Sequence, residues 1–273
     1  MTPTVTAIVL NWNNAQDTLA CLASLAQQDH PHRVLVVDNG STDDSVARIA
    51  AAYPAVEILQ TGENLGYAGG NNAGIRRALE DGAEHVFVLN NDVTLAPDCL
   101  RALLEAAQSM PRVGVVGGIV YDAPASSDTE TPWRIQSAGI RLSMLCDAQH
   151  RGEGQLDSGQ FAAIEQVDAI KGCAMLVSRE AIAAVGVLDE QCAEEPAPDP
   201  VSSTGQALIR GRVLARRTGA IDRAFHPQCR LDRRDPILGI QPAQFREHAQ
   251  LLPREDQPAP RQRTRQRVDL VAG

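Results

Sequence analysis

Short apolar runs alternate with stretches of helical periodicity through the first 120 residues, and this alternation restricts the fold more than any other feature of the sequence. The apolar runs have the length of strands and cover residues 4–10, 33–37, 56–59, 85–89 and 113–120. An amphipathic stretch follows each of the first four, and the last of these, residues 96–110, is expected to carry Pro97 in the first turn of a helix. Alternating strands and helices imply a mostly parallel sheet with helices on both faces. The sequence therefore predicts an α/β fold with a ligand site at the carboxyl ends of its strands.

Carboxylates follow two of these predicted strands. Asp38 comes after the second apolar run, and Asp92, preceded by Asn90, comes after the fourth. Each alone has an ordinary explanation, since Asp38 fits a turn or a helix cap and Asp92 fits a turn in which a side chain bonds its own backbone. Because the carboxyl ends of parallel strands meet at one edge of the sheet, the two together favour a ligand site.

A glycine-rich stretch, ENLGYAGGNNAG at residues 63–74, lies between the third and fourth apolar runs. Gly66, Gly69 and Gly70 open the helix that is predicted to continue through residues 72–82. The N–H groups at a helix N-terminus can face an anion, so this stretch adds an anion-binding element next to the two acidic strand ends.

The loop after the first strand and the charge of the chain argue against several classes of function. That loop reads NWNNAQD, whereas dinucleotide-binding folds carry Gly-x-Gly-x-x-Gly there and nucleotidyltransferases usually carry a glycine-rich loop with Arg or Lys. The net charge is −9, and residues 210–273 hold 14 Arg against 7 Asp and Glu, which leaves −16 on the remainder. An acidic chain whose basic segment lacks interleaved aromatic residues is a poor nucleic-acid binder. Hydride transfer, nucleotidyl transfer and nucleic-acid binding are therefore disfavoured.

Cysteine spacing and hydropathy indicate a compartment. The six cysteines form no C-x-x-C pair and have no histidine at zinc-ligand spacing, so they are expected to be reduced structural thiols. No apolar stretch approaches the ~20 residues that cross a bilayer, and no basic segment precedes the first apolar run. We expect a cytoplasmic protein, with contact at the inner face of the cytoplasmic membrane left open.

Five segments in order resemble the family 2 glycosyltransferases, particularly their rhamnosyltransferase-like branch. They are VTAIVLNWNN, VLVVDNGSTDDS, ENLGYAGGNNAGI, VFVLNNDV and IKGCAMLVSREAIAAVGVLDE, within about residues 4–190. The resemblance implies the GT-A fold, with a nucleotide-sugar-binding part over about residues 1–120 and an acceptor-side part over about residues 121–190. It further implies transfer with inversion from a UDP- or dTDP-sugar, with rhamnose as a candidate sugar, to a saccharide or lipid-linked acceptor in cell-surface polysaccharide synthesis.

The same resemblance implies roles for individual residues. Asp38 corresponds to the acid that hydrogen-bonds the nucleobase, and Asp92 to the carboxylate that holds Mg²⁺ or Mn²⁺ against the donor diphosphate. Asn90 stands in the place of the first carboxylate of a fuller D-x-D-type motif, as a weaker ligand or a sugar contact. Lys171, the only lysine of the chain, receives no role. The other nucleotide-sugar-binding residues expected are Asn11, Ser41, Asn64, Gly66, Gly70 and Asn72.

The resemblance ends after residue 190. The family normally continues with an aromatic pair and an acidic motif, roughly F-F-x-Y-x-E-D-x-D-L, whose carboxylate deprotonates the acceptor hydroxyl. Here Ala197 and Pro198 occupy the place of the acidic pair, and the local substitutes for the general base are Glu194, Glu195 and Asp199.

Residues 191–273 are rich in Arg and Pro and are predicted to be irregular, with a disordered tail over residues 253–273. Two origins remain open for this region, a divergent C-terminal part and a shifted reading frame. The basic tail is either solvated or attracted to anionic lipid. Two functions therefore stay open, an active glycosyltransferase and a nucleotide-sugar-binding remnant without a general base.

Overall fold

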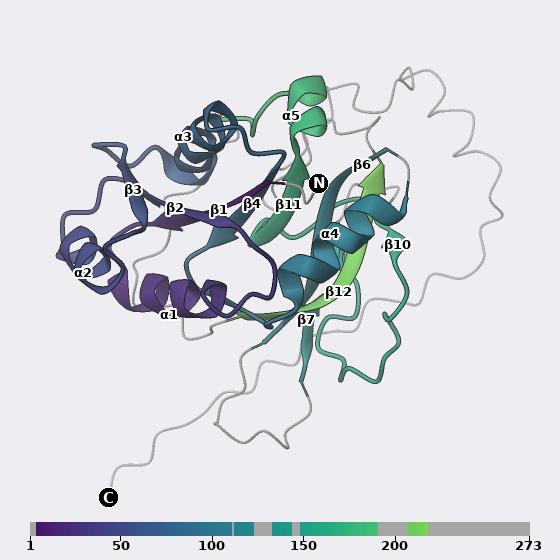
Figure 1. Ribbon diagram of the computed structural model, residues 1–273. Coiled ribbons are helices and arrows are strands. Elements are labelled where there is room, and N and C mark those ends of the chain that lie inside the picture. Colours follow the sequence, from purple (N-terminus) through teal and green to yellow (C-terminus); the bar gives the residue numbers. More distant parts are fainter. Residues whose placement is uncertain (1–3, 111, 123–132, 144–147, 191–206, 218–273) are drawn as a thin grey trace, which may run out of the picture. The chain divides into compact units, whose positions relative to one another are not determined.

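The computed structural model describes residues 4–110, 112–122, 133–143 and 148–190, together with the backbone of residues 207–217. Up to residue 122 the chain alternates strands and helices (Figure 1), in the order β1 (Val5–Asn11), α1 (Ala15–Leu25), β2 (Arg33–Asp38), α2 (Ser45–Ala52), β3 (Glu57–Gln60), α3 (Gly66–Glu80), β4 (His85–Asn90), β5 (Val93–Leu95), α4 (Cys99–Ser109) and β6 (Val113–Tyr121). Then follow β7 (Ile135–Ser137), β8 (Ile140–Leu142), β9 (Ala148–His150), β10 (Glu165–Gln166), β11 (Ala174–Ser178), α5 (Arg179–Val185) and β12 (Ala207–Arg217).

The main sheet has the strand order β10-β12-β6-β11-β4-β1-β2-β3, with β5 paired to β12 and β7 to β6. The strands β3, β2, β1 and β4 are parallel neighbours, as the βαβ alternation predicts. β11 lies antiparallel between β4 and β6, and β12 runs antiparallel to β6. The helices α1, α2 and α3 provide the long crossover connections that the parallel strands need. The sheet is parallel from β3 to β4, as predicted, and mixed as a whole because of the antiparallel pairs that β11 and β12 form.

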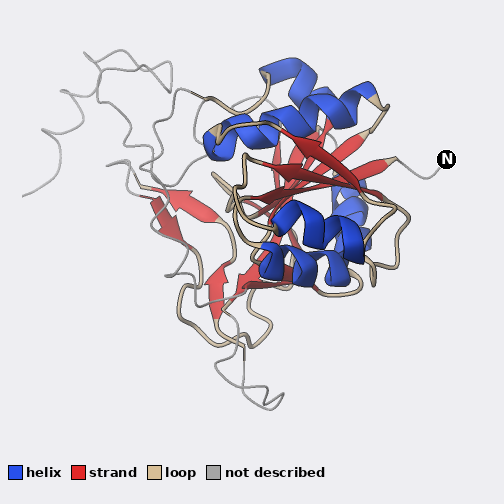
Figure 2. Cartoon of the chain, turned by 90° about the vertical axis from the view of Figure 1, so that its left-hand side faces the viewer, coloured by secondary structure: helices blue, strands red, loops and turns tan. Residues whose placement is uncertain are grey.

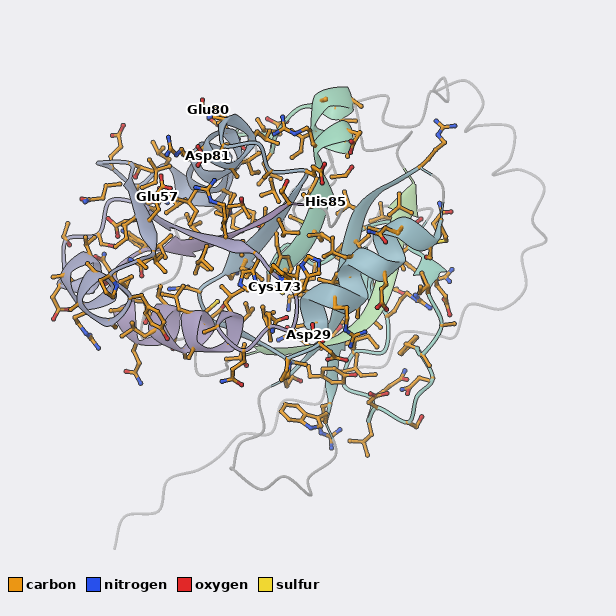
Figure 3. All side chains as sticks on the ribbon, in the orientation of Figure 1. Asp29, Glu57, Glu80, Asp81, His85 and Cys173 are labelled. Atoms are coloured by element: carbon orange, nitrogen blue, oxygen red, sulfur yellow. The ribbon has the colours of Figure 1, made fainter. Side chains whose placement is uncertain are left out.

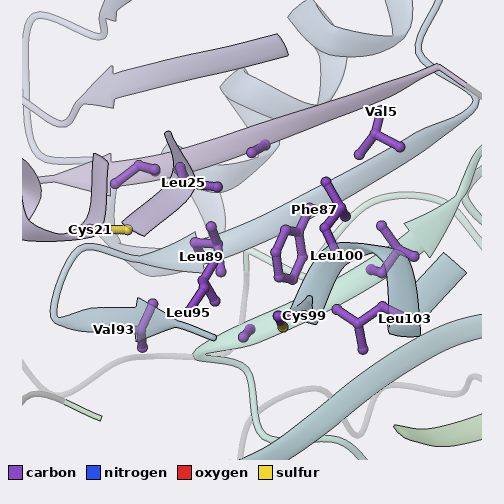
Figure 4. Close-up of a cluster of buried hydrophobic side chains, with 14 of the residues drawn as sticks. Val5, Cys21, Leu25, Phe87, Leu89, Val93, Leu95, Cys99, Leu100 and Leu103 are labelled. Carbon is purple, nitrogen blue, oxygen red and sulfur yellow. The ribbon is translucent and has the colours of Figure 1, made fainter. Parts of the chain in front are cut away.

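Helices cover both faces of this sheet (Figure 2). On one face, α1 and α4 bury Leu25 and Leu100 in a cluster with Phe87 of β4, and α2 adds to the same cluster (Figure 4). On the other face, α3 and α5 bury Ile75 and Ile182 in a second cluster. Burying one side chain of this size contributes roughly 1.5–3 kcal/mol, so the two clusters fix the strand ends that carry the polar residues.

Of two predicted helix starts, one is confirmed and one is wrong. α3 begins at Gly66, so Gly66, Gly69 and Gly70 open the helix as predicted, and it ends at Glu80. The prediction that Pro97 lies in the first turn of α4 is wrong, because Asp98 is the N-cap and the helix begins at Cys99. The short strand β5 and a turn in which the Cys99 N–H donates to the Ala96 carbonyl occupy the preceding residues.

Part of the region predicted to be irregular is a strand. The backbone of residues 207–217 forms β12, which pairs with β5 and β6 and so extends the main sheet. The predicted tail at residues 253–273 lies outside the described residues.

Three cysteines are described, and all three are buried and free, as predicted for structural thiols. Burial raises the pKa of Cys21 and of Cys173 to about 12, so both remain protonated at neutral pH. Cys146, Cys192 and Cys229 lie outside the described residues. Among the helices that the structure describes, none has the length and apolar character needed to cross a membrane.

Candidate active site

The first part of the site lies where β1 and β2 end. Asp38 is directly opposite Asn11, and Asn11 Nδ2 donates to Asp38 Oδ1 at 2.9 Å and to Ser41 Oγ at 3.1 Å. Thr18 Oγ1 donates to Asn11 Oδ1 at 2.7 Å, which fixes the orientation of that amide. Asp38 is 3% exposed, and its Oδ2 accepts the Ser41 N–H at 3.2 Å, as in a turn. Asn11, Asp38 and Ser41 therefore come together, and each carboxylate oxygen retains a second lone pair for a further donor.

Asn39, which was not among the predicted site residues, joins the end of β2 to the start of α3. Its Nδ2 donates to Asn64 Oδ1 at 2.9 Å and to the Gly66 carbonyl at 3.1 Å, and its Oδ1 accepts the Leu65 N–H at 3.1 Å. Asn64 Oδ1 also accepts the Gly66 N–H at 2.8 Å. The predicted residues Asn64 and Gly66 thus lie beside β2, and Asn64 accepts the first N–H of α3.

Close packing explains two of the glycines next to this network. A Cβ at Gly70 would lie 2.6 Å from Leu10 Cδ1 and 3.0 Å from Asn39 Cγ. Gly40 has a φ of +75°, and a Cβ there would lie 2.5 Å from the carbonyl carbon of Glu63. Gly70 therefore lets α3 approach the polar ends of β1 and β2, which places it in the site as a packing residue.

The side chain of Asn72 makes hydrogen bonds to the segment after α5. It is fully buried, and its Nδ2 donates to the Leu188 carbonyl at 2.8 Å and to Glu190 Oε1 at 2.7 Å. Its Oδ1 accepts the Leu188 N–H at 2.9 Å. Hydrogen bonds from Asn72 and then from Arg76 hold the pKa of Glu190 below its usual range. Asn72 therefore holds the segment after α5 against α3.

The first turn of α3 makes a second contact with the acceptor-side part. Tyr67 Oη donates to the Gly172 carbonyl at 2.6 Å, and a Cβ at Gly172 would lie 3.0 Å from Tyr67 Oη. Together with Asn72, this bond connects α3 to both ends of the segment that contains β11 and α5. The glycine-rich helix thus couples the two parts of the fold, a role that its sequence did not reveal.

Asp92 lies in the turn after β4 and is half-buried. Burial is the main cause that raises its pKa, and the charge of Asp17 adds to the increase, whereas Lys171 and a hydrogen bond from Asn90 lower it. Asn91 Nδ2 donates to Thr18 Oγ1 at 3.1 Å, which ties the turn to α1. A carboxylate whose charge is disfavoured by burial gains stability from a nearby cation.

The donor atoms of this turn fit a hard divalent cation that has other ligands as well. Asp92 supplies a carboxylate, and Asn90 supplies an amide oxygen as a further candidate ligand. Within the described parts of the chain, no group of three or more His, Cys, Asp or Glu side chains is placed to hold a metal. The described residues would therefore supply only part of the coordination shell of such a cation.

The predicted base candidates Glu194, Glu195 and Asp199 all lie outside the described residues. The general base therefore remains a prediction from the sequence.

The mixed sheet flanked by helices is the GT-A fold of the glycosyltransferases, in agreement with the family match. The chain belongs to glycosyl transferase family 2, whose sequence profile matches residues 6–184. The match ends just before the region in which the resemblance to the family motifs breaks.

Individual relatives are similar over shorter stretches. An N-acetylglucosaminyl-diphospho-decaprenol L-rhamnosyltransferase of Mycobacterium tuberculosis is 35% identical over 135 residues, which cover 46% of this chain and 44% of the relative. The low-salt glycan biosynthesis hexosyltransferase Agl10 of Haloferax volcanii is 29% identical over 164 residues, or 57% of this chain and 47% of the relative. The chain therefore spans less than half the length of these curated relatives.

A solved structure with a similar fold is the mannosyltransferase PcManGT from Pyrobaculum calidifontis in complex with GDP-Man and Mn²⁺. It is 18% identical, the match covers 70% of this chain and 49% of that one, and the TM-score is 0.48.

Proposed function

We propose that this chain binds a UDP- or dTDP-sugar and transfers the sugar, with inversion, during the synthesis of a cell-surface polysaccharide. One observation carries the proposal, namely that Asp38 and the Asn90–Asp92 turn stand on either side of the end of β1. Since β2 and β4 both pair with β1, the two sites are two inter-strand spacings apart, which is about 10 Å. A nucleoside diphosphate can bridge such a distance from its base to its phosphates.

The residues at this edge have complementary tasks in the proposed reaction. Asp38, held by Asn11 and the Ser41 N–H, accepts a hydrogen bond from the ring N–H of uracil or thymine. Asp92 holds Mg²⁺ or Mn²⁺, with Asn90 as a weaker ligand or sugar contact. When bound, the cation stabilises the negative charge of the leaving diphosphate.

The sugar and acceptor are proposed from the mycobacterial relative, whose name describes L-rhamnosyl transfer and a lipid-linked diphospho-sugar. We propose L-rhamnose as the sugar and a lipid-linked saccharide as the acceptor. Such an acceptor would bring the enzyme to the inner face of the cytoplasmic membrane.

A second candidate is a nucleotide-sugar-binding protein that lacks efficient transfer. Ala197 and Pro198 favour it, because they occupy the place of the family's acidic pair. A positioned base typically contributes on the order of 10²–10⁴-fold in rate, so its loss would leave slow transfer or only donor hydrolysis. A shifted reading frame after residue 190 is the proposed origin in that case, and reading the gene in all three frames near codon 191 tests it directly.

Turnover distinguishes the two candidates. Purified protein with UDP- or dTDP-sugars, Mn²⁺ and lipid-linked or saccharide acceptors should yield glycosylated product together with free nucleotide. Release of nucleotide without product would support the remnant, and failure to bind any nucleotide would contradict both.

A further inference from the structure

Lys171 stands at the turn that carries Asp92. β11 pairs antiparallel with β4, with Ala174 opposite Leu89, and the Asn90 N–H donates to the Cys173 carbonyl at 3.0 Å. These pairings bring the residues before β11 next to the residues after β4. Figure 3 labels Cys173, which lies just before β11. The charge of Lys171 lowers the Asp92 pKa, as expected if the ammonium and the carboxylate are near each other. The only lysine of the chain is thus at the proposed metal site.

The structure also fixes the position of this side chain. Lys171 is half-buried, and its Nζ donates a hydrogen bond to Gln136 Oε1 from β7. The backbone next to Lys171 is fixed as well, because Tyr67 Oη donates to the carbonyl of the following residue, Gly172. An ammonium group has three N–H donors, and within the described residues Gln136 is the acceptor for one of them, so a further acceptor can bind the same group.

We propose that Lys171 binds the diphosphate of the nucleotide-sugar donor beside the cation held by Asp92, and this proposal rests on the donor site proposed above. The diphosphate is strongly anionic, and Asp92 together with an amide oxygen is a small ligand set for a divalent ion. A second positive charge at the same turn would compensate for that incomplete coordination. An N–H bond from a charged donor to a phosphate oxygen is among the stronger hydrogen bonds.

The same contact would assist departure of the leaving group. During transfer, the bond from the anomeric carbon to the β-phosphate oxygen breaks, and its electron pair stays on that oxygen. The acceptor oxygen forms the new bond to the carbon, and its proton passes to the general base. Lys171 offsets the charge that develops on the phosphate and does not exchange a proton in this step.

The test measures the preference for UDP over UMP, because the extra phosphate is the group that Lys171 would bind. Isothermal titration calorimetry is done on the full chain with Mn²⁺ and again with a chelator, and is repeated with dTDP and dTMP. Lys171→Gln should weaken UDP binding on the order of ten-fold under both conditions and UMP binding less. Lys171→Arg, which keeps the charge, should retain most of the affinity.

Arg33→Gln is the matched control, because it removes one positive charge at the start of β2, roughly 17 Å along the strand from Asp38. It should leave both affinities unchanged. Unchanged UDP affinity in a folded Lys171→Gln variant, or an equal loss for UDP and UMP, would overturn the role of Lys171 while leaving the donor site intact. If the wild-type chain binds neither UDP nor dTDP, the proposed donor site is itself wrong and the role of Lys171 is wrong with it.

Discussion

Replacing Asn72 with alanine separates a structural role from a nucleotide contact. The side chain makes three hydrogen bonds to residues 188–190, and its removal leaves the Leu188 N–H and carbonyl and one Glu190 oxygen without this partner. Each bond contributes about 1 kcal/mol net, and partial access of water to Leu188 limits the penalty. We expect Asn72→Ala to lower the free energy of unfolding by roughly 2–3 kcal/mol, and Tm by roughly 4–12 °C for a domain of this size.

Asn71→Ala provides the comparison within the same helix. Asn71 is equally buried, but among the described residues its Nδ2 donates to the Tyr67 carbonyl of its own helix, at 2.9 Å, and its Oδ1 has no partner. Its substitution should cost about 1 kcal/mol or less, since alanine is also the better helix former. Thermal unfolding measures stability, and calorimetry with UDP or dTDP measures binding. If Asn72→Ala keeps its stability but loses nucleotide affinity, Asn72 is a ligand contact and the reasoning is refuted.

The remaining predictions concern the two carboxylates. Asp38→Ala should weaken UDP or dTDP binding in calorimetry without unfolding the protein, and unchanged affinity would reduce Asp38 to a turn residue. Asp92→Asn should bind UDP about equally with Mn²⁺ or with a chelator, and a wild-type metal response in this variant would contradict the assignment of Asp92 as a metal ligand. The variant should keep its stability at neutral pH, because burial disfavours the ionised carboxylate. Since its pKa is raised, the carboxylate gains a proton at higher pH than an ordinary aspartate when the solution is acidified. As the pH is lowered, the metal-assisted nucleotide affinity of the wild type should therefore start to fall at a pH above the usual titration range of aspartate. Calorimetric titrations with UDP at a series of pH values, in buffers that do not bind the metal ion, measure this.

The central strands could be predicted from the sequence because both faces of the sheet are covered. β1, β2 and β4 are nearly continuous apolar runs, and each ends at a polar residue that the fold places at one edge. Glycine is a poor helix former, so the glycines inside α3 need a further explanation. Packing explains the choice, since a Cβ at Gly74 would lie 2.7 Å from Ile8 Cγ2 and 2.8 Å from Val37 Cγ2. The strands β7 to β10 have only two or three residues each, too few to show a period.

The roles of individual site residues depended on contacts that are distant in sequence. Asp38 and Asp92 could be chosen as candidates because strand ends are visible in the apolar pattern. The contact of Asn72 with Leu188 could not be predicted, because Leu188 lies 116 residues further along the chain and no local signal marks such a pair. No local signal marks Lys171 either, since only the pairing of β11 with β4 brings it to Asp92.

The measurement that tests the account most directly is a nuclear magnetic resonance titration of isotope-labelled protein with dTDP or UDP in the presence of Mg²⁺. The account predicts saturable shifts of backbone amides at the carboxyl edge, around Asn11, Asp38, Ser41 and the Asn90–Asp92 turn. Amides at the opposite edge, around Glu57 and Asp81, which share ion pairs with Arg77 and are labelled in Figure 3, should remain unshifted. Absence of saturable shifts, or shifts confined to that opposite edge, would contradict a nucleotide-sugar site at the ends of β2, β1 and β4.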